Sequence, residues 1–233
     1  MLISRIADLL MPCECPVCGA PADAGGALCA GCLLEMPRLP LYDRAESAEL
    51  AILANAVCPP SFIAAWMLYD PFRPHAEMIR TSKYRGRPGL ARRLGALFAA
   101  EFADTYPEAA ARPDVLIPVP MYWRKELTRG YNQAVCIAHG IGNVLGVPVA
   151  DNLVAVRPHA TQTRRSAQQR RANIEGIFSV LHPSDFDGLD VVIVDDVITT
   201  GATIGEVAIA LGRAGARPAS VGAMALGMAG GER

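Results

Sequence analysis

The strongest constraint on the fold is a run near the C-terminal end, Val191–Thr203, with the sequence VVIVDDVITTGAT. The aliphatic residues Val191–Val194 are typical of a strand that is buried on both faces, as in a parallel sheet covered by helices. Two carboxylates, Asp195 and Asp196, follow directly, and a Thr/Gly turn then leads into an apolar helical pattern. This order predicts a strand–turn–helix unit of an α/β domain, whose turn lies where ligands bind in such sheets.

The rest of the chain shows the same alternation of strand and helix patterns. Short apolar runs predict strands at residues 62–69, 114–119, 148–150, 153–156, 177–180, 189–195 and 220–226. Helical periodicity predicts helices at residues 76–102 with a break near Gly86 and Pro88, at 132–145, and at 203–214 with Gly215 as its end. We therefore expect an α/β fold in which a parallel sheet is flanked by helices on both faces.

The turn has the composition of a phosphate site. A helix N-terminus offers unpaired N–H groups and a positive dipole, glycine allows close approach of the backbone, and threonines add hydroxyl donors. The candidate ligand-binding residues are Thr199, Thr200, Gly201, Ala202 and Thr203. Asp195 and Asp196 would repel a phosphate, but they suit sugar hydroxyls or a magnesium ion. Together these groups describe a site for a ribose 5-phosphate. An ordinary helix with a threonine N-cap would explain the threonines, but not the two acids.

Basic residues follow an earlier predicted strand. That strand ends in Pro118-Val119-Pro120, and Arg124, Lys125 and Arg129 come shortly afterwards. Cations and backbone donors suit a diphosphate opposite the sugar, although cations that serve only solubility would give the same pattern. Residues 157–173 are also polar and basic and lack apolar periodicity. Such a segment is typical of a lid over a reaction site or of an exposed surface loop.

The N-terminal region contains a paired cysteine motif, Cys15-x-x-Cys18 followed by Cys29-x-x-Cys32. Two residues between thiolates allow one turn to aim both sulfurs at one ion, and two such turns supply the four soft ligands that structural zinc accepts. The alternative is a set of buried or redox-active thiols. Because so short a segment cannot build its own core, we expect residues 1–40 to form an N-terminal helix and a zinc ribbon, and residues 41–233 to form the α/β domain.

Charge is distributed unevenly along the chain. Residues 73–171 contain 16 Lys and Arg against 7 Asp and Glu, whereas residues 1–72 and 172–233 each contain 3 against 8. A basic middle suits a phosphorylated ligand or a nucleic acid, although a solvated basic face would give the same count. The sequence shows no secretory signal and no unbroken apolar run of about 20 residues. We therefore expect a cytoplasmic protein without membrane insertion.

The run from Asp195 to Thr203 resembles the signature of the type I phosphoribosyltransferases. The resemblance implies a fold of that type and a ligand, 5-phosphoribosyl 1-diphosphate with Mg²⁺. It also implies that the two acids bracket the ribose hydroxyls, that residues 199–203 wrap the 5-phosphate, and that Pro118–Trp123 faces the diphosphate. The candidate catalytic residues are Asp195, Asp196 and Arg129, and the further ligand-binding candidates are Pro118, Val119, Pro120 and Lys83.

The motifs taken together resemble the ComF family, which joins a four-cysteine zinc ribbon to a phosphoribosyltransferase domain. The resemblance is carried by the cysteine motif and by residues 83–86 (KYRG), 118–120 (PVP), 129–133 (RGYNQ), 161–163 (TQT), 171–173 (RAN) and 195–203. It implies an association with DNA uptake during competence. The amidophosphoribosyltransferase chemistry sometimes attached to this family is not expected, because the first cysteine is Cys13 and no glutaminase domain fits.

Three functions are compatible with these residues. The first is transfer of the phosphoribosyl group, with Zn²⁺ as a structural ion and Mg²⁺ bound with the sugar diphosphate. The second is a non-catalytic role in handling single-stranded DNA, with uptake-machinery proteins as partners. The third is a regulator that senses the sugar diphosphate or a related nucleotide in the same pocket. Because about seven residues follow the last predicted strand, an acceptor pocket would have to come from the ribbon, residues 33–75 or the basic segment.

Overall fold

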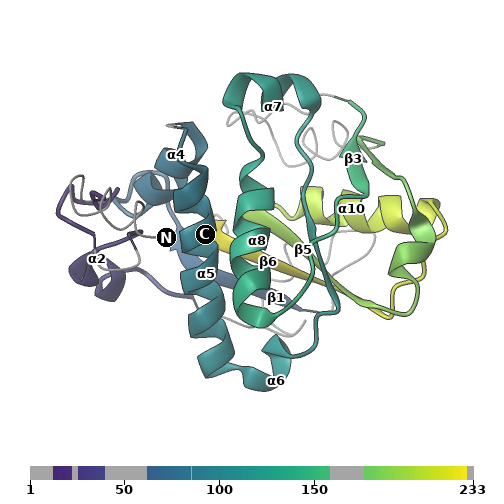
Figure 1. The fold of residues 1–233 in the computed structure, drawn as a ribbon, viewed down its shortest axis with the longest axis horizontal. Helices are drawn as coiled ribbons and strands as arrows, with labels where there is room; N and C mark the ends of the chain where they lie inside the picture. Colours follow the sequence, from purple (N-terminus) through teal and green to yellow (C-terminus); the bar gives the residue numbers. More distant parts are fainter. Residues whose placement is uncertain (1–12, 23–25, 40–61, 85, 158–175, 230–233) are drawn as a thin grey trace, which may run out of the picture.

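Strand β5 (Asp190–Ile198) is an inner strand of a four-stranded sheet in the computed structural model (Figure 1). Its neighbours are β6 (Ser220–Ala229) on one side and β2 (Val115–Pro118) on the other, and β1 (Ile63–Tyr69) pairs with β6 at the far edge. All three pairings are parallel, which confirms the predicted parallel sheet. The structure describes residues 13–22, 26–39, 62–84, 86–157 and 176–229.

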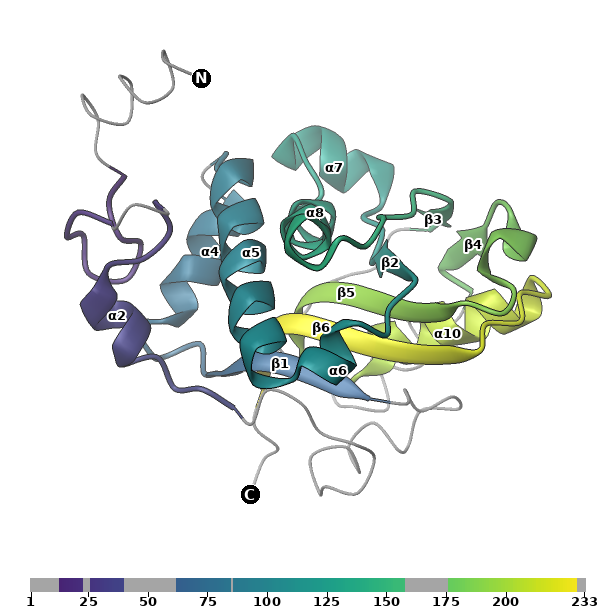
Figure 2. The same cartoon turned by 60° about the horizontal axis from the view of Figure 1, so that its bottom comes forward.

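The side chains of β5 alternate between two hydrophobic layers. Val192 and Val194 pack into one layer, and Val191 and Ile193 pack into the other. The first layer is built with helices α4 (Ala76–Tyr84), α5 (Pro88–Thr105) and α8 (Gln133–Leu145), and the second with α10 (Ala202–Arg213). Figure 2 shows α5 and α8 on one side of the sheet and α10 on the other. Successive side chains of a strand point to opposite faces, and those of Val191–Val194 are all apolar. Both faces of the sheet are therefore covered by helices.

The remaining elements are short. They are α2 (Ala30–Leu34), α6 (Pro107–Ala110), α7 (Trp123–Arg129), the 3-10 helix η1 (Pro183–Phe186), and the antiparallel pair β3 (Leu153–Ala155) and β4 (Phe178–Val180). Most of the predicted lid, residues 158–173, and the predicted N-terminal helix lie outside the described residues. Within the described ranges, no helix combines the length and apolar character that crossing a bilayer requires.

Helices α5 and α8 pack backbone against backbone. A Cβ atom at Gly95 of α5 would collide with the carbonyl oxygen of Ile137, and one at Gly140 of α8 would collide with the carbonyl oxygen of Arg92. Only glycine fits such an approach without moving main chain. This contact fixes α8 against α5, and it therefore helps to position the loop that precedes α8.

Two sequence predictions differ from the structure. Residues 148–150 form a single parallel bridge, between Leu116 and Val149, instead of a strand. Helix α7 was not predicted, because none of its residues is buried and it therefore carries no apolar periodicity. It ends at Gly130, whose φ of 88° lies in the left-handed region that stops a helix.

The cysteine-rich region packs against the α/β domain through a shared core. Cys15, Leu28 and Met36 belong to the same hydrophobic cluster as Trp66 of β1 and Phe98 of α5. The division at residue 40 stays a prediction, and the core itself continues from one predicted domain into the other.

The segment that leaves the cysteine-rich region lines the outer edge of β1. The Leu68 N–H donates to the Pro37 carbonyl at 2.8 Å. Arg38 binds Glu101 of α5 with 2.6 Å between nitrogen and oxygen, and the same carboxylate accepts a hydrogen bond from the Trp66 indole at 3.0 Å. These bonds join the N-terminal region to both β1 and α5.

Candidate functional site

Both carboxylates lie within β5, whereas the predicted strand, residues 189–195, includes only Asp195. The strand continues to Ile198, three residues beyond its predicted end, because β6 still pairs with it there. In contrast, β2 stops at Pro118, opposite Val194, so the register leaves Asp195 and Asp196 beyond the end of β2. Since adjacent residues of a strand face opposite sides, Asp196 shares the face of Val194, toward α4 and α8. We refer to Asp195 and Asp196 as the acid pair.

Lys83, near the end of α4, reaches the acid pair. Its Nζ lies 2.7 Å from Oδ2 of Asp196, and the two side chains are 22% and 15% exposed. Burial by itself would lower the pKa of Lys83, but the charge of Asp196 and its hydrogen bond raise it. The structure thus brings together three candidates, Lys83, Asp195 and Asp196, that lie far apart in the sequence.

The acid pair also interacts internally. The Asp196 N–H donates to the Asp195 carboxylate at 2.8 Å. Burial and, second, the charge of Asp196 raise the pKa of Asp195 to about 7. Near neutral pH the pair therefore carries less negative charge than two free carboxylates would. A divalent cation would favour the fully ionised pair, and carboxylate oxygens are the ligands that magnesium accepts in proteins.

Two cations of α7 lie near the same groups. Burial lowers the pKa of Lys125, the charges of Arg129 and Lys83 lower it further, and both acids of the pair act in the opposite direction. Lys125 therefore lies close enough to the acid pair to interact with both charges, and Arg129 lies close to Lys125. Arg129 was predicted as a site residue, whereas Lys125 was noted only as one of several cations. Arg124, which precedes Lys125 in the sequence, contacts an aromatic ring: its guanidinium lies 5.1 Å from the centre of the Trp123 ring.

The turn after β5 leaves the N-terminus of α10 open. The N-cap residue is Gly201, with a φ of 66°, and no side chain forms a cap hydrogen bond with this helix. The alternative of a threonine N-cap is therefore wrong. Thr199 is exposed, and Thr200 and Thr203 are partly exposed. With a glycine in the left-handed region and no side-chain cap hydrogen bond, this turn has the form of an anion site.

The predicted diphosphate loop is buried at its start. Pro118, Val119 and Pro120 are all buried. The Val119 N–H donates to the Val194 carbonyl at 2.9 Å, and its carbonyl accepts from the Asn132 side chain at 3.0 Å. Both polar backbone groups of Val119 thus hold the loop against β5 and α8. The assignment of these three residues to ligand binding stays a prediction.

Residues 131–133 brace α4 against α8. The Tyr131 hydroxyl donates to the Ser82 carbonyl, and the Gln133 side chain donates to the Ser82 hydroxyl. Ser82 directly precedes Lys83, so these bonds hold the turn of α4 that carries the lysine. These contacts join segments about 50 residues apart, so no local sequence pattern indicates them.

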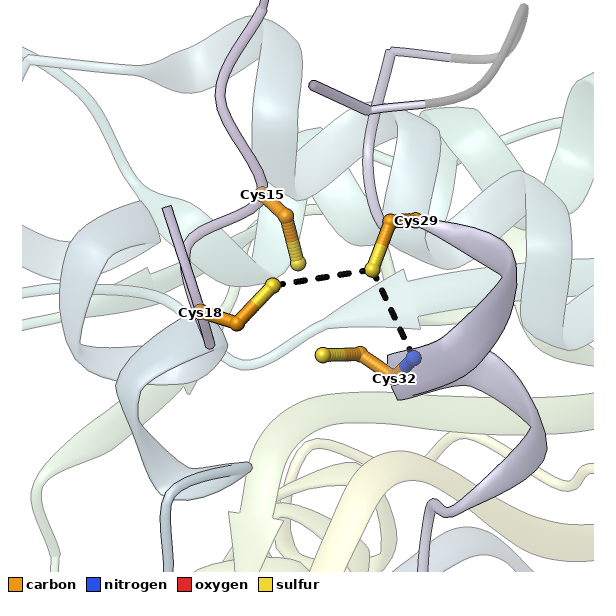
Figure 3. Close-up of side chains that lie close together, drawn as sticks. All are labelled: Cys15, Cys18, Cys29 and Cys32. Carbon is orange, nitrogen blue, oxygen red and sulfur yellow. Dashed lines mark hydrogen bonds between the residues drawn. The ribbon is translucent and has the colours of Figure 1, made fainter. Parts of the chain in front are cut away.

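The four cysteines of the paired motif converge on one point (Figure 3). Their sulfur atoms all lie within 4.8 Å of one another, and those of Cys18 and Cys29 are 3.6 Å apart. Zinc–sulfur bonds of about 2.3 Å in a tetrahedron separate the sulfurs by about 3.8 Å. The first pair lies on a tight turn with Gly19 at a φ of 77°, and the second pair lies at the start of α2, where Cys29 is the N-cap.

The cluster has the chemistry of a structural zinc site. Burial and the neighbouring thiols raise the pKa of Cys32, so these sulfurs resist becoming thiolates together unless a cation is present. Every cysteine that the structure describes is a free thiol, and Cys13 and Cys136 stand outside the four-cysteine cluster. Cys58 falls outside the described ranges. The arrangement is compatible with a zinc ribbon, as the spacing predicts.

The comparisons with known proteins agree with this site. Residues 131–231 match the family described as the phosphoribosyl transferase domain, a range that includes β5, the acid pair and the open turn before α10. This part of the chain is therefore a domain of the phosphoribosyl transferase type. Over nearly its whole length the chain is also 30% identical to Competence protein F of Haemophilus influenzae, an alignment that covers 87% of this chain and 91% of that protein. The chain therefore belongs to the competence protein F family.

Other similar proteins carry related names. DNA utilization protein YhgH of Salmonella typhimurium is 29% identical over 89% of this chain and 81% of its own length. Competence protein ComFC of Bacillus subtilis is 27% identical over 82% of this chain and 68% of its own length. A solved structure of glutamine phosphoribosylpyrophosphate amidotransferase from B. subtilis matches 63% of this chain with a TM-score of 0.42 and 22% identity. This chain spans 30% of that enzyme's chain.

Proposed function

We propose that this protein binds 5-phosphoribosyl 1-diphosphate together with Mg²⁺ and transfers the phosphoribosyl group to an acceptor. The observation that carries the proposal is the contact of Lys83 with the acid pair, with Lys125 nearby, on the strand that leads into the N-terminus of α10; Arg129 lies next to Lys125. A sugar with a phosphate at one end and a diphosphate at the other needs all of these groups. The zinc ribbon is proposed as a structural element, held by Cys15, Cys18, Cys29 and Cys32.

Each group would have a separate task in the transfer. The N–H groups of α10 and the hydroxyls of residues 199–203 would bind the 5-phosphate. The acid pair would orient the ribose hydroxyls and hold Mg²⁺, which supplies charge neutralisation of the diphosphate when bound. In the reaction the bond from C1 to the diphosphate oxygen breaks, its electron pair leaves with the diphosphate, and a new bond forms from C1 to the acceptor. Lys83, Lys125 and Arg129 would stabilise the negative charge that develops on the leaving group.

The proposal is tested by binding and by turnover. Titration of the full chain with 5-phosphoribosyl 1-diphosphate should give saturable heat that depends on Mg²⁺. Asp196→Asn should weaken this binding by roughly tenfold or more, because it removes a charged hydrogen-bond acceptor. Asp104→Asn is the matched control, since Asp104 is an exposed aspartate of α5. Absence of binding to the zinc-loaded protein would refute the proposal, whereas binding without diphosphate release would favour a ligand-sensing regulator.

A second candidate function is the handling of single-stranded DNA. It is favoured by the surface of α7, where the Tyr122 and Trp123 rings lie 5.8 Å apart, Trp123 is 53% exposed, and the Arg124 guanidinium lies over the indole. The two rings are tilted by 49° to each other, and exposed aromatic rings beside cations suit the stacking of single-stranded bases. The names of the similar proteins, which refer to competence and DNA utilisation, support this setting.

Salt dependence tests this second candidate. Affinity for an oligothymidine should fall steeply with added salt, because bound phosphates release counterions. Trp123→Ala should weaken it by roughly fivefold to a hundredfold, whereas Val144→Ala, at another exposed apolar position, should not. No binding at low salt would exclude the candidate.

A further inference from the structure

Helix α4 connects the cysteine-rich region with the acid pair. The helix begins at Ala76 and carries Lys83 near its other end, where the lysine contacts Asp196. In both overall views α4 lies between α2 and α5 (Figures 1 and 2). Ala76 and Lys83 are seven residues apart in this helix, so they are separated by about 10 Å along its axis. A movement at the start of so short a helix is also felt at its end.

The start of α4 is bound to a member of the four-cysteine cluster. His75 directly precedes Ala76, and its ring Nε2 lies 2.9 Å from the carbonyl oxygen of Cys32. Because a carbonyl oxygen only accepts hydrogen bonds, Nε2 carries the proton and donates it. Cys32 thus offers its sulfur to the cluster and its main-chain carbonyl to the residue before the helix. An ion that holds the sulfur of Cys32 would therefore help to hold His75.

The cysteine-rich region and α4 also share a core. Met78 and Ile79 of α4 are fully buried, and they belong to the same hydrophobic cluster as Cys15 and Cys32. Side chains packed at the density of a protein interior leave no room for one element to slide independently of the other. A displacement of the cysteine-rich region would therefore be passed to α4.

The far end of α4 is sensitive to such a displacement. The contact between Lys83 and Asp196 is 2.7 Å long, and a shift of about 1 Å would take it beyond the usual hydrogen-bond limit of about 3.2 Å. The bonds from Tyr131 and Gln133 to Ser82 hold this end of the helix against α8. The bond from His75 holds the other end. Both ends of α4 therefore determine where the ammonium group of Lys83 lies.

We propose that His75 is a positioning residue for the site of the sugar diphosphate: it places Lys83 through α4, and it thereby couples the four-cysteine cluster to the acid pair. This inference rests on the proposed function, in which Lys83 stabilises the leaving diphosphate. Because coupling between two sites is reciprocal, a ligand at the acid pair also stabilises the contact between His75 and Cys32. A residue that only anchored the helix would add stability without this effect.

The first experiment compares substitutions of His75 in the zinc-loaded full chain by titration calorimetry. His75→Phe keeps a ring but removes the donor, and it should weaken binding of 5-phosphoribosyl 1-diphosphate with Mg²⁺ by roughly threefold to tenfold, the effect of about one hydrogen bond. His75→Gln retains an N–H donor and should keep most of the affinity. His182→Phe changes an exposed histidine at the start of η1, and this matched control should bind like the parent protein.

A double-mutant cycle separates positioning from a general loss of stability. If His75 acts through Lys83, His75→Phe should have no further effect on ligand binding once Lys83→Met is present. If His75→Phe instead disturbs the whole domain, it should weaken binding by the same factor in both backgrounds.

Hydrogen exchange of the parent protein tests the coupling without any variant. Saturating sugar diphosphate should slow the exchange of the amides of α2, which carries Cys32 and lies at the cysteine cluster. In His75→Phe, the ligand at saturation should leave the exchange of these amides unchanged.

The outcomes distinguish this inference from the proposed function. The inference is overturned, and the proposed function stands, if the parent protein binds the sugar diphosphate and any one of four results is found. These results are equal binding by His75→Phe, equally weak binding by His75→Gln and His75→Phe, independent effects of the substitutions at positions 75 and 83, or no protection of α2 by the ligand. If the parent protein does not bind the sugar diphosphate, the proposed function fails and the positioning role fails with it.

Discussion

The ion pair between Lys83 and Asp196 supports a quantitative prediction about Lys83→Met. Removal of one partner of a buried ion pair costs about 3–5 kcal/mol. Both side chains here retain some exposure, 22% and 15%, so we expect a loss of about 2 kcal/mol in the free energy of unfolding at about pH 8. Stability is lost because the substitution removes the ammonium group that neutralises part of the charge of the acid pair.

The same loss should depend on pH. Because the pKa of Asp195 is raised to about 7, its ionised form destabilises the fold above that pH. This penalty disappears as the pH falls toward the ordinary carboxyl range. Lys83→Met removes a charge that lowers the pKa of Asp195, so the effect of the substitution should be largest at about pH 8 and should shrink at about pH 5.

Urea unfolding of the zinc-loaded protein without added magnesium measures this effect. Lys125→Met is the matched control: burial and like charges lower the pKa of Lys125, so its removal should cost less. A double-mutant cycle with Asp196→Asn should give a coupling of about 1–2 kcal/mol between positions 83 and 196. Equal losses at both pH values, or a coupling below about 0.5 kcal/mol, would refute the reasoning.

Three further predictions concern packing, metal and ligand. Gly140→Ala should destabilise the protein by about 1–3 kcal/mol, because its Cβ would collide with the backbone of α5. The control is Gly212→Ala in α10, where nothing lies within 4 Å of the added Cβ, and it should leave stability unchanged or raise it. Thermal melting measures both variants. Cys32→Ser should lower zinc content and melting temperature together, whereas Cys136→Ser should leave zinc content unchanged in a metal assay. Magnesium-dependent binding of the sugar diphosphate should strengthen as the pH rises through about 7 and Asp195 loses its proton; calorimetry of Asp195→Asn should show no such rise.

The strands and the larger helices could be predicted because their buried residues are apolar and recur with a regular spacing in the sequence. In β5 the four consecutive aliphatic residues face two covered layers, and this pattern is visible without the structure. Helix α7 could not be predicted in this way, because a helix with no buried residue has no apolar stripe. The extension of β5 to Ile198 depends on pairing with β6, which local sequence does not record.

The candidate site was also predictable only in those parts that are local in the sequence. The acid pair and the turn before α10 are local in sequence, so their composition alone indicated phosphate and sugar chemistry. The contact between Lys83 and Asp196 joins residues more than 100 positions apart, and the role of Lys125 depends on where α7 lies.

The segment that leaves the cysteine-rich region has one further consequence. Strand β1 ends the sheet on its outer side, and an uncovered edge strand is a template for pairing with another chain. Pro37 and Arg38 occupy that edge through the hydrogen bond from Leu68 and the bridge from Arg38 to Met67. Metal loss that releases this segment would therefore expose β1, and the first product would be self-association through the sheet edge, before the α/β domain itself unfolds.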